Sequence, residues 1–293
     1  MQAYTRIHPA VLTAQFTFIL LSVMFTFNPI LQMISMLGGI LYLIALGKSD
    51  TLKESIKYYI IILVITTLTN PLFSHYGQTV LFKIGIFKIT FESLMFGAGL
   101  GISIIAVMVW CQAYSSVMTT EKYVSLFKGK LPKTALTITI TLRYIPMLKR
   151  RWQEILSAQR ALGMYSYKNG YEKIKFFLIC FLALIEWSFE NAANTVNSIL
   201  ARSCKGIKRT SCSYYKIQKY DLILLILSVV LFLTFSFMNI EGYTDFEYYP
   251  KIKMQNFNLK SLTSVIIFTV MAFIPFFIEL KEYLLWKYYR SKI

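Results

Sequence analysis

Long apolar runs, each close to the length that a helix needs to cross a bilayer, dominate both ends of this chain. They occupy residues 11–46, 56–73, 93–119, 222–240 and 262–280. About 20 helical residues cross the hydrocarbon core. The first run has double length and is interrupted by Asn28-Pro29, where the residue before proline leaves the helical region and the chain can turn back. The pattern predicts an all-α polytopic membrane bundle of about six spans.

The stretch between the fourth and fifth predicted spans is basic. Residues 120–219 hold 18 of the 31 Lys and Arg but five of the 14 Asp and Glu, so they carry +13 of the net charge of +17. Loops rich in Lys and Arg stay in the cytoplasm. We therefore expect a membrane bundle over 1–119, a cytoplasmic region over 120–219, and two spans with a basic tail over 220–293.

This arrangement predicts a multi-pass protein of the cell membrane with both termini in the cytoplasm. Its loops around residues 75–91 and 241–247 then lie outside. The N-terminal apolar stretch is too long for the h-region of a signal peptide, and no small-residue cleavage site follows it. We expect that stretch to be retained as a span.

The basic region has the periodicity of long helices. Apolar residues of the segment 147–163 lie close to one stripe, as in an amphipathic helix, with Pro146 suited to the first turn and Gly163 to the C-terminal end. A second helix is expected from about residue 171 to 202. Its apolar part, 176–189, contains Glu186 and is too short to span a bilayer, which predicts a helix lying against the bundle.

Two further patterns concern helix surfaces. The stretch 134–142 alternates Thr with apolar residues as a strand would, but a lone strand has no partner for its backbone, so we predict a helix. Gly97 and Gly101 give the fourth span a small face suited to close helix packing. The stripe formed by Glu186, Glu190, Asn194 and Asn197 is typical of a solvated helix face.

The sequence offers little chemistry. The predicted spans contain almost no ionisable residue, whereas proton relays and intramembrane hydrolases require one at mid-depth. Gly47-Lys48-Ser49 imitates the end of a phosphate-binding loop, but Tyr42 stands where that loop needs glycine. No catalytic set, disulfide framework or metal-ligand cluster occurs among its Cys and His residues. We expect neither enzymatic activity nor a cofactor nor a bound metal.

Several short blocks occur in one order and spacing between residues 8 and 220. They are Asn70-Pro71-Leu72-Phe73, Thr79-Val80-Leu81-Phe82, Phe91-Glu92, Met118-Thr119-Thr120-Glu121-Lys122, Leu142-Arg143-Tyr144-Ile145-Pro146, Ala158-Gln159, Trp187-Ser188-Phe189-Glu190-Asn191-Ala192, Ala201-Arg202 and Arg209-Thr210. Together they resemble the transmembrane (T) component of energy-coupling factor (ECF) transporters, the ABC importers of vitamins and trace metals. The last two spans rest on hydropathy alone.

This resemblance implies a coupling subunit without a nucleotide site. T components present two long cytoplasmic coupling helices to a pair of ABC ATPase subunits, and their membrane part holds a separate substrate-binding S subunit. Arg143, Pro146, Glu190 and Asn191 match the family's coupling-helix blocks. The resemblance thus implies transmission of ATP-driven motion to the S subunit, which itself determines the substrate.

The resemblance also marks two expected contacts with the ATPases. In the family, each coupling helix ends in an Ala-Arg-Gly motif whose arginine reaches acidic groups of an ATPase. Here the second motif is Ala201-Arg202-Ser203, with serine in place of glycine. The first aligns with Ala161-Leu162-Gly163 and lacks the arginine, for which Arg160 is a possible substitute.

Two other functions compete with this interpretation. A secondary transporter or channel is disfavoured by the uncharged spans. A membrane-anchored scaffold whose basic region binds anionic lipid or nucleic acid is compatible with the charge, but it does not require the ordered blocks. We expect membrane lipid, but no nucleic acid, among the partners.

Overall fold

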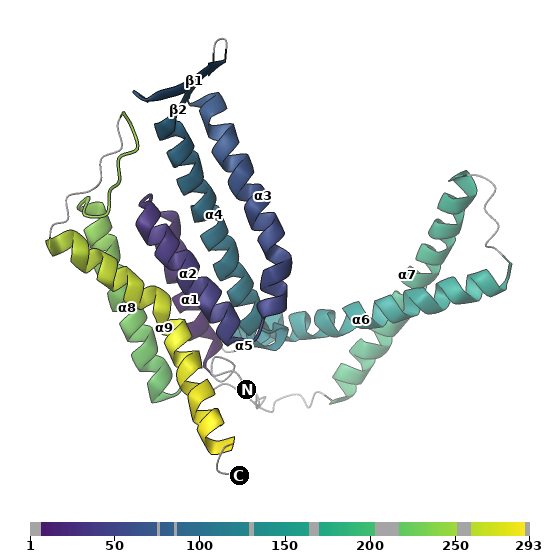
Figure 1. The fold of residues 1–293 in the computed structure, drawn as a ribbon. Helices are drawn as coiled ribbons and strands as arrows, with labels where there is room; N and C mark the ends of the chain where they lie inside the picture. The colour runs from purple at the N-terminus through teal and green to yellow at the C-terminus, as the bar shows by residue number, and fades with distance from the viewer. Residues whose placement is uncertain are drawn as a thin grey trace. The chain divides into compact units, whose positions relative to one another are not determined.

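The computed structural model describes residues 7–74, 77–84, 87–128, 132–163, 170–202, 217–250 and 259–290. Within these ranges the chain forms nine helices and one β-hairpin (Figure 1). The elements are α1 (Pro9–Met24), α2 (Pro29–Ala45), α3 (Ser49–Phe73), β1 (Val80–Ile84), β2 (Phe87–Thr90), α4 (Phe91–Val117), α5 (Thr120–Lys128), α6 (Pro132–Ala161), α7 (Gly170–Arg202), α8 (Lys219–Ile240) and α9 (Leu259–Arg290).

The chain divides into two compact units. Unit 1 comprises Met1–Tyr123 and Tyr215–Ile293, and unit 2 is the intervening segment Val124–Tyr214. In unit 1, α4 packs against α2 and α3, α2 also packs against α9, and α1 packs against α8. The buried side chains of α1, α2 and α4 include Phe16, Tyr42 and Trp110, whose rings contact one another.

Five helices are long and apolar enough to cross a membrane, namely α3, α4, α7, α8 and α9. The helices α1 and α2 are apolar but shorter, with 16 and 17 residues. The predicted break between them is confirmed: α1 ends at Met24, and Asn28 caps α2 by accepting a 3.0 Å hydrogen bond from the Ile30 amide. The length and hydropathy of α7 suit a span as well, so the prediction that its apolar part is too short to cross a bilayer is not supported. The basic charge of residues 120–219 is the reason to expect this helix in the cytoplasm.

One end of unit 1 gathers three connections that are far apart in the sequence. Tyr248, in the α8–α9 connection, donates a 3.1 Å hydrogen bond to the carbonyl of Phe27, between α1 and α2. Ser74, at the end of α3, lies 3.1 Å from the hydroxyl of Tyr249. The predicted alternation of the spans requires these connections to share one side of the membrane, and the contacts agree with it.

Close packing of α3 against α4 confirms the small face predicted on the fourth span. A Cβ atom added to Gly97 would lie 2.8 Å from the carbonyl oxygen of Thr66, and one added to Gly101 would lie 2.5 Å from the Thr66 hydroxyl. Contacts this short cannot be accommodated without moving the α3 backbone at Gly97. The two glycines therefore determine how closely the helices approach.

The structure corrects the sequence analysis at two places. Pro146 does not begin a helix but lies inside α6, which runs unbroken from Pro132 to Ala161; the residues before it form the helix that the alternating stretch 134–142 was expected to form. The predicted outer loop contains the antiparallel hairpin β1–β2, with Lys83 opposite Lys88. Its nine strand residues are too few to show a clear alternating pattern.

Candidate functional site

The helices α6 and α7 of unit 2 cross each other near the middle of α6. Three side-chain contacts define the crossing: Tyr144 Oη with Thr195 Oγ1 at 2.9 Å, Asn191 Nδ2 with Met147 Sδ at 3.9 Å, and the Arg151 guanidinium over the Trp187 ring at 5.5 Å from its centroid. As the numbers rise along α6 they fall along α7, so the helices run antiparallel here. An aromatic pair, Trp152 with Phe177, extends the contact.

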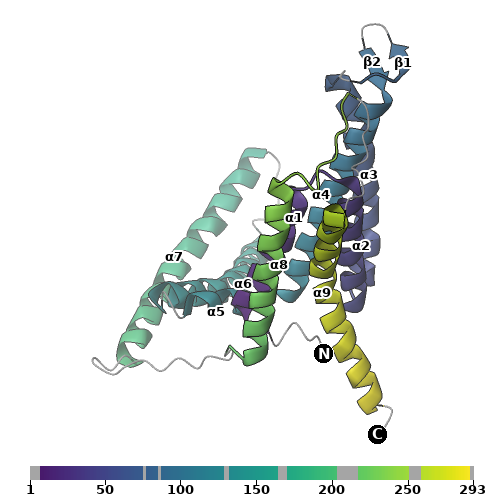
Figure 2. The same ribbon diagram turned by 90° about the vertical axis from the view of Figure 1, so that its left-hand side faces the viewer.

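The antiparallel crossing separates the two helix ends that carry the expected ATPase motifs. At 1.5 Å per residue, the end of α6 lies about 21 Å beyond Met147 and the end of α7 about 17 Å beyond Asn191. The two C-termini extend from the crossing in different directions, and both views show this divergence (Figures 1 and 2). The pair of helices thus presents two separate tips.

The tip of α6 is exposed. Arg160 and Ala161 form its last turn, Leu162 is 74% exposed, and Gly163 adopts a left-handed φ of 78° that stops the helix. An apolar side chain with this exposure, next to an arginine, is suited to contact a partner. The arrangement agrees with the predicted C-terminal stop at Gly163.

The tip of α7 carries the second of the expected motifs. Ala201 is exposed and Arg202 is the last helical residue, a position at which a cation is favoured by the helix dipole. Ser203 lies outside the described residues. Arg202 is therefore placed at a helix end, as the sequence analysis expected.

The other residues expected to shape the coupling helices surround the crossing. Asn191 is half-buried and contacts α6, whereas Arg143, Pro146 and Glu190 are exposed. Pro146 lies between Tyr144 and Met147, which both contact α7. The Leu142–Pro146 and Trp187–Ala192 blocks, which carry part of the resemblance to T components, meet at this crossing.

The surface of α7 is unusually apolar for a helix with so little cover. Phe177, Leu178, Phe181, Leu182 and Phe189 are between 43% and 73% exposed. The predicted polar stripe of this helix is exposed too, which agrees with a solvated face. An apolar surface of this extent indicates a protein or lipid partner.

Other blocks of the resemblance meet in unit 1, where they join helix ends. The Asn70 side chain donates a 2.6 Å hydrogen bond to the Ser93 carbonyl, which links the end of α3 to the start of α4. The buried carboxylate of Glu92 accepts a 3.2 Å hydrogen bond from the Thr79 amide. A Cβ added to Gly77 would lie 2.7 Å from this carboxylate, so the chain passes close to it.

Lys122 lies at the opposite end of α4, and the sequence analysis did not predict that it is buried. It is 1% exposed and its ammonium donates a 3.1 Å hydrogen bond to the carbonyl of Val117, the last residue of α4. Burial lowers the pKa of Lys122 to about 8. A cation near the free carbonyls of a helix C-terminus is favourable, so this lysine ties α5 to the end of α4.

The described residues hold no group of three or more His, Cys, Asp or Glu side chains that could bind a metal ion. Of the four cysteines, Cys111 is exposed and Cys180 is buried, while Cys204 and Cys212 lie outside the described residues. The crossing and its tips offer surfaces for binding rather than groups for catalysis.

Residues 6–214 match the family model described as "CbiQ: Cobalt transport protein". The energy-coupling factor transporter transmembrane protein EcfT of Streptococcus equi is 28% identical over 227 residues, which cover 71% of this chain and 82% of that protein. The EcfT 1 protein of Listeria monocytogenes is 25% identical over 170 residues, covering 54% and 64% of the two chains.

A further relative is the "Uncharacterized protein MG181 homolog" of Mycoplasma pneumoniae, 32% identical over 111 residues. That alignment covers 37% of this chain, and this chain spans a quarter of the length of that relative. The matched family region includes α1 to α7, and it ends before α8.

Proposed function

This chain belongs to the CbiQ family of transport proteins, and on this premise we propose that it is the T component of an ECF-type ABC importer. It is a multi-pass membrane protein of a family of transporter subunits rather than of enzymes. In this proposal it transmits ATP-driven motion from two ABC ATPase subunits to an S subunit that binds a vitamin or another micronutrient.

The observation that carries the proposal is the antiparallel crossing of α6 and α7. One helix pair that ends in two separate tips suits a pair of ATPases, because each tip can dock on one of them. The exposed Leu162 is the anchor of the first tip, with Arg160 beside it, and Arg202 supplies the charge of the second. Apolar anchors contribute most of the binding energy at such interfaces, and charges contribute register and association rate.

The crossing contacts suit the transmission of motion between the tips. Tyr144, Met147 and Arg151 hold α6 on α7 through a hydrogen bond, a sulfur contact and a cation–π contact. When ATP closes the ATPase dimer, the tips move with their ATPases, and the crossing converts that movement into a change of angle between the helices. We expect the S subunit to respond to this change through the apolar surface of α7.

A co-purification experiment tests the proposal. We expect the tagged chain, extracted from its native membranes in a mild detergent, to carry two ABC ATPase subunits and a small membrane protein that binds the substrate, all identified by mass spectrometry. The isolated chain should neither bind nor hydrolyse ATP, because it has no complete phosphate-binding loop. Tight ATP binding by the isolated chain, or recovery without any ATPase, would contradict the assignment.

A further inference from the structure

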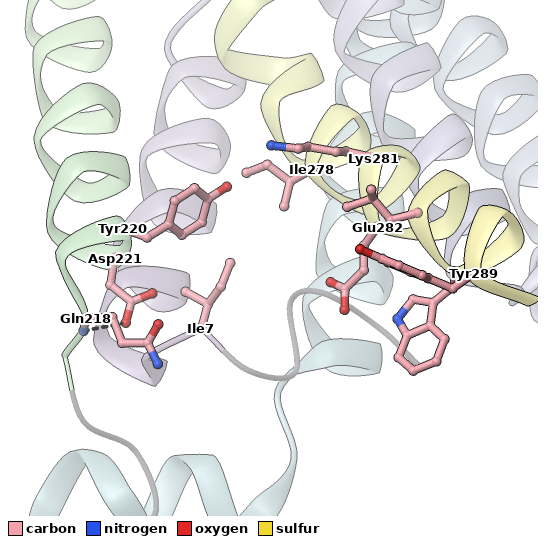
Figure 3. Close-up of a pocket in the computed structure, with 10 residues that line it drawn as sticks. Ile7, Gln218, Tyr220, Asp221, Ile278, Lys281, Glu282 and Tyr289 are labelled. Atoms are coloured by element: carbon pink, nitrogen blue, oxygen red, sulfur yellow. Dashed lines mark hydrogen bonds between the residues drawn. The ribbon is translucent and has the colours of Figure 1, made fainter.

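A cavity lies in unit 1 where the start of α8 faces the last turns of α9. Its volume is about 580 Å³, within the range of roughly 300 to 1,000 Å³ that is usual for small-molecule sites. Figure 3 shows Tyr220 and Asp221 on one wall and Lys281, Glu282 and Tyr289 on the other. The rest of the lining consists of Ile7, Gln218, Ile278, Leu285 and Trp286.

Charged side chains face each other across this cavity. Asp221 is 4% exposed, and one of its carboxylate oxygens accepts a 3.1 Å hydrogen bond from the backbone amide of Gln218. Glu282 is half-buried on the opposite wall, next to the single lysine of the lining, Lys281. Two carboxylates and one ammonium group give the lining a formal charge of −1. It therefore suits a ligand with one cationic group for the carboxylates and one anionic group for the lysine.

The cavity continues into an apolar groove between the same two helices. A second cavity of about 300 Å³ shares Tyr220 and Ile278 with the first. Its remaining lining is entirely apolar: Ile223, Leu224, Leu227, Val270, Ile274 and Phe277. The combined site therefore has a charged, aromatic head and an apolar tail that runs along the spans.

We propose that this site binds one zwitterionic aminophospholipid, with its headgroup in the charged cavity and one acyl chain in the α8–α9 groove. The primary ammonium donates hydrogen bonds to Asp221 and Glu282, and the phosphate pairs with Lys281. Charge-assisted hydrogen bonds of this kind are stronger than neutral ones. Trp286 and Tyr289 flank the headgroup, as aromatic residues do at the membrane surface.

The charge of the lining decides between lipid classes. An anionic headgroup would bring its phosphate towards two carboxylates without a cation to pair with them. A choline headgroup has a cation but no N–H donor, so it can donate a hydrogen bond to neither carboxylate. Phosphatidylethanolamine satisfies both requirements. The site lies on α8 and α9, beyond the family match that ends at residue 214, and it does not depend on the proposed coupling function.

Native mass spectrometry of the purified full chain tests the proposal. The chain is exchanged into detergent with equal amounts of phosphatidylethanolamine, phosphatidylcholine and phosphatidylglycerol. We expect one retained phosphatidylethanolamine per chain, and a loss of about tenfold in its retention for Glu282→Gln, which removes one charge-assisted contact. Lys281→Gln should weaken retention as well. Glu247→Gln, on the exposed α8–α9 connection, is the matched control and should change nothing.

Each other outcome overturns the proposal. Equal retention of the three lipids means that the groove holds bulk lipid without selecting a headgroup. Preferential retention of phosphatidylglycerol means that Lys281 dominates over the carboxylates. Unchanged phosphatidylethanolamine retention by a folded Glu282→Gln variant removes the ammonium contact. Because Asp221 also caps α8, Asp221→Asn is compared only if its thermal unfolding matches that of the parent chain.

Discussion

The indole N–H of Trp110 donates a hydrogen bond of 2.9 Å to the hydroxyl of Ser35, which joins α4 to α2 inside unit 1. The same N–H lies 3.2 Å from the Ser35 carbonyl oxygen. Both residues are fully buried. A Cβ added to Gly39 on α2 would lie 3.4 Å from the indole ring, an ordinary contact, but 2.7 Å from Val109, so the glycine leaves room for the Val109 side chain beside the indole.

Trp110→Phe should destabilise unit 1 by about 1 to 3 kcal/mol, because the buried Ser35 hydroxyl loses the hydrogen bond that it accepts from the indole. The smaller ring also leaves a void next to Gly39. Thermal unfolding in detergent measures the change. Met108→Leu, at an exposed position of the same helix, is the control, and an equal loss of stability in both variants would show that the hydrogen bond is unimportant.

Lys122 predicts a pH dependence of stability. Its pKa of about 8 in the folded chain lies below the reference value of 10.5, so between these values the unfolded chain binds more protons than the folded chain. The free energy of unfolding should therefore rise as pH increases from about 8 to 10.5, by about 1 to 3 kcal/mol.

The variant Lys122→Met isolates this effect. It keeps a long side chain at the buried position but removes the charge, so the rise in thermal stability between pH 8 and pH 10 should flatten. Lys149→Met, at an exposed position of α6, should keep the rise of the parent chain. A Lys122→Met profile that still rises like the parent's would assign the dependence to another group.

Hydropathy predicted most of unit 1 because its helices face lipid or one another, and an uninterrupted apolar run is a direct signal for such a helix. The turn at Asn28 could also be predicted, because a cap residue followed by proline is a local signal for the start of a helix. The contact of Gly97 with Thr66 could be predicted only in part. The spacing of the glycines indicated a small helix face, but it did not indicate which helix packs against that face.

The crossing of α6 and α7 could not be derived from periodicity. Its contacts join residues 36 to 51 positions apart, such as Arg151 with Trp187 and Tyr144 with Thr195, and no local pattern encodes their register. The predicted start of a helix at Pro146 was wrong, because proline is common in the first turn of a helix. Here it lies inside α6, where the helix continues without the backbone hydrogen bond that proline cannot donate. The cavity between α8 and α9 likewise depends on two helices whose contact no local pattern encodes.

The orientation of the chain is open to a labelling test. We predict that both termini and residues 120–219 are cytoplasmic, because short basic segments remain on that side. In a variant without its native cysteines, a membrane-impermeant thiol reagent added from outside should modify Gln78→Cys and Asp245→Cys and miss Lys149→Cys. All three positions are exposed. Labelling of Lys149→Cys in intact cells would reverse the topology and, with it, the proposed contact with cytoplasmic ATPases.

Arg202 provides the sharpest test of coupling, because it ends α7 and matches the arginine of the motif in the resemblance. If Arg202 serves its own helix only, Arg202→Ala costs a few tenths to about 1 kcal/mol of stability and leaves transport unchanged. If it pairs with an acidic group of an ATPase, its loss leaves a partly desolvated charge unpaired at the interface, which costs about 2 to 5 kcal/mol of binding energy. We expect the second result.

The tip of α6 lacks the motif arginine, so we expect a large effect of Arg202→Ala and a partial rescue by restoring an arginine at the α6 tip. Leu162 stands where the first motif has arginine, so there is little redundancy, and ATPase co-purification and uptake by Arg202→Ala should fall steeply while membrane insertion and thermal unfolding stay near those of the parent. Leu162→Arg should restore part of the assembly. Lys173→Ala, in the first turn of the same helix and exposed, is the matched control. An Arg202→Ala chain that retains both ATPases and supports normal uptake would remove Arg202 from the coupling interface.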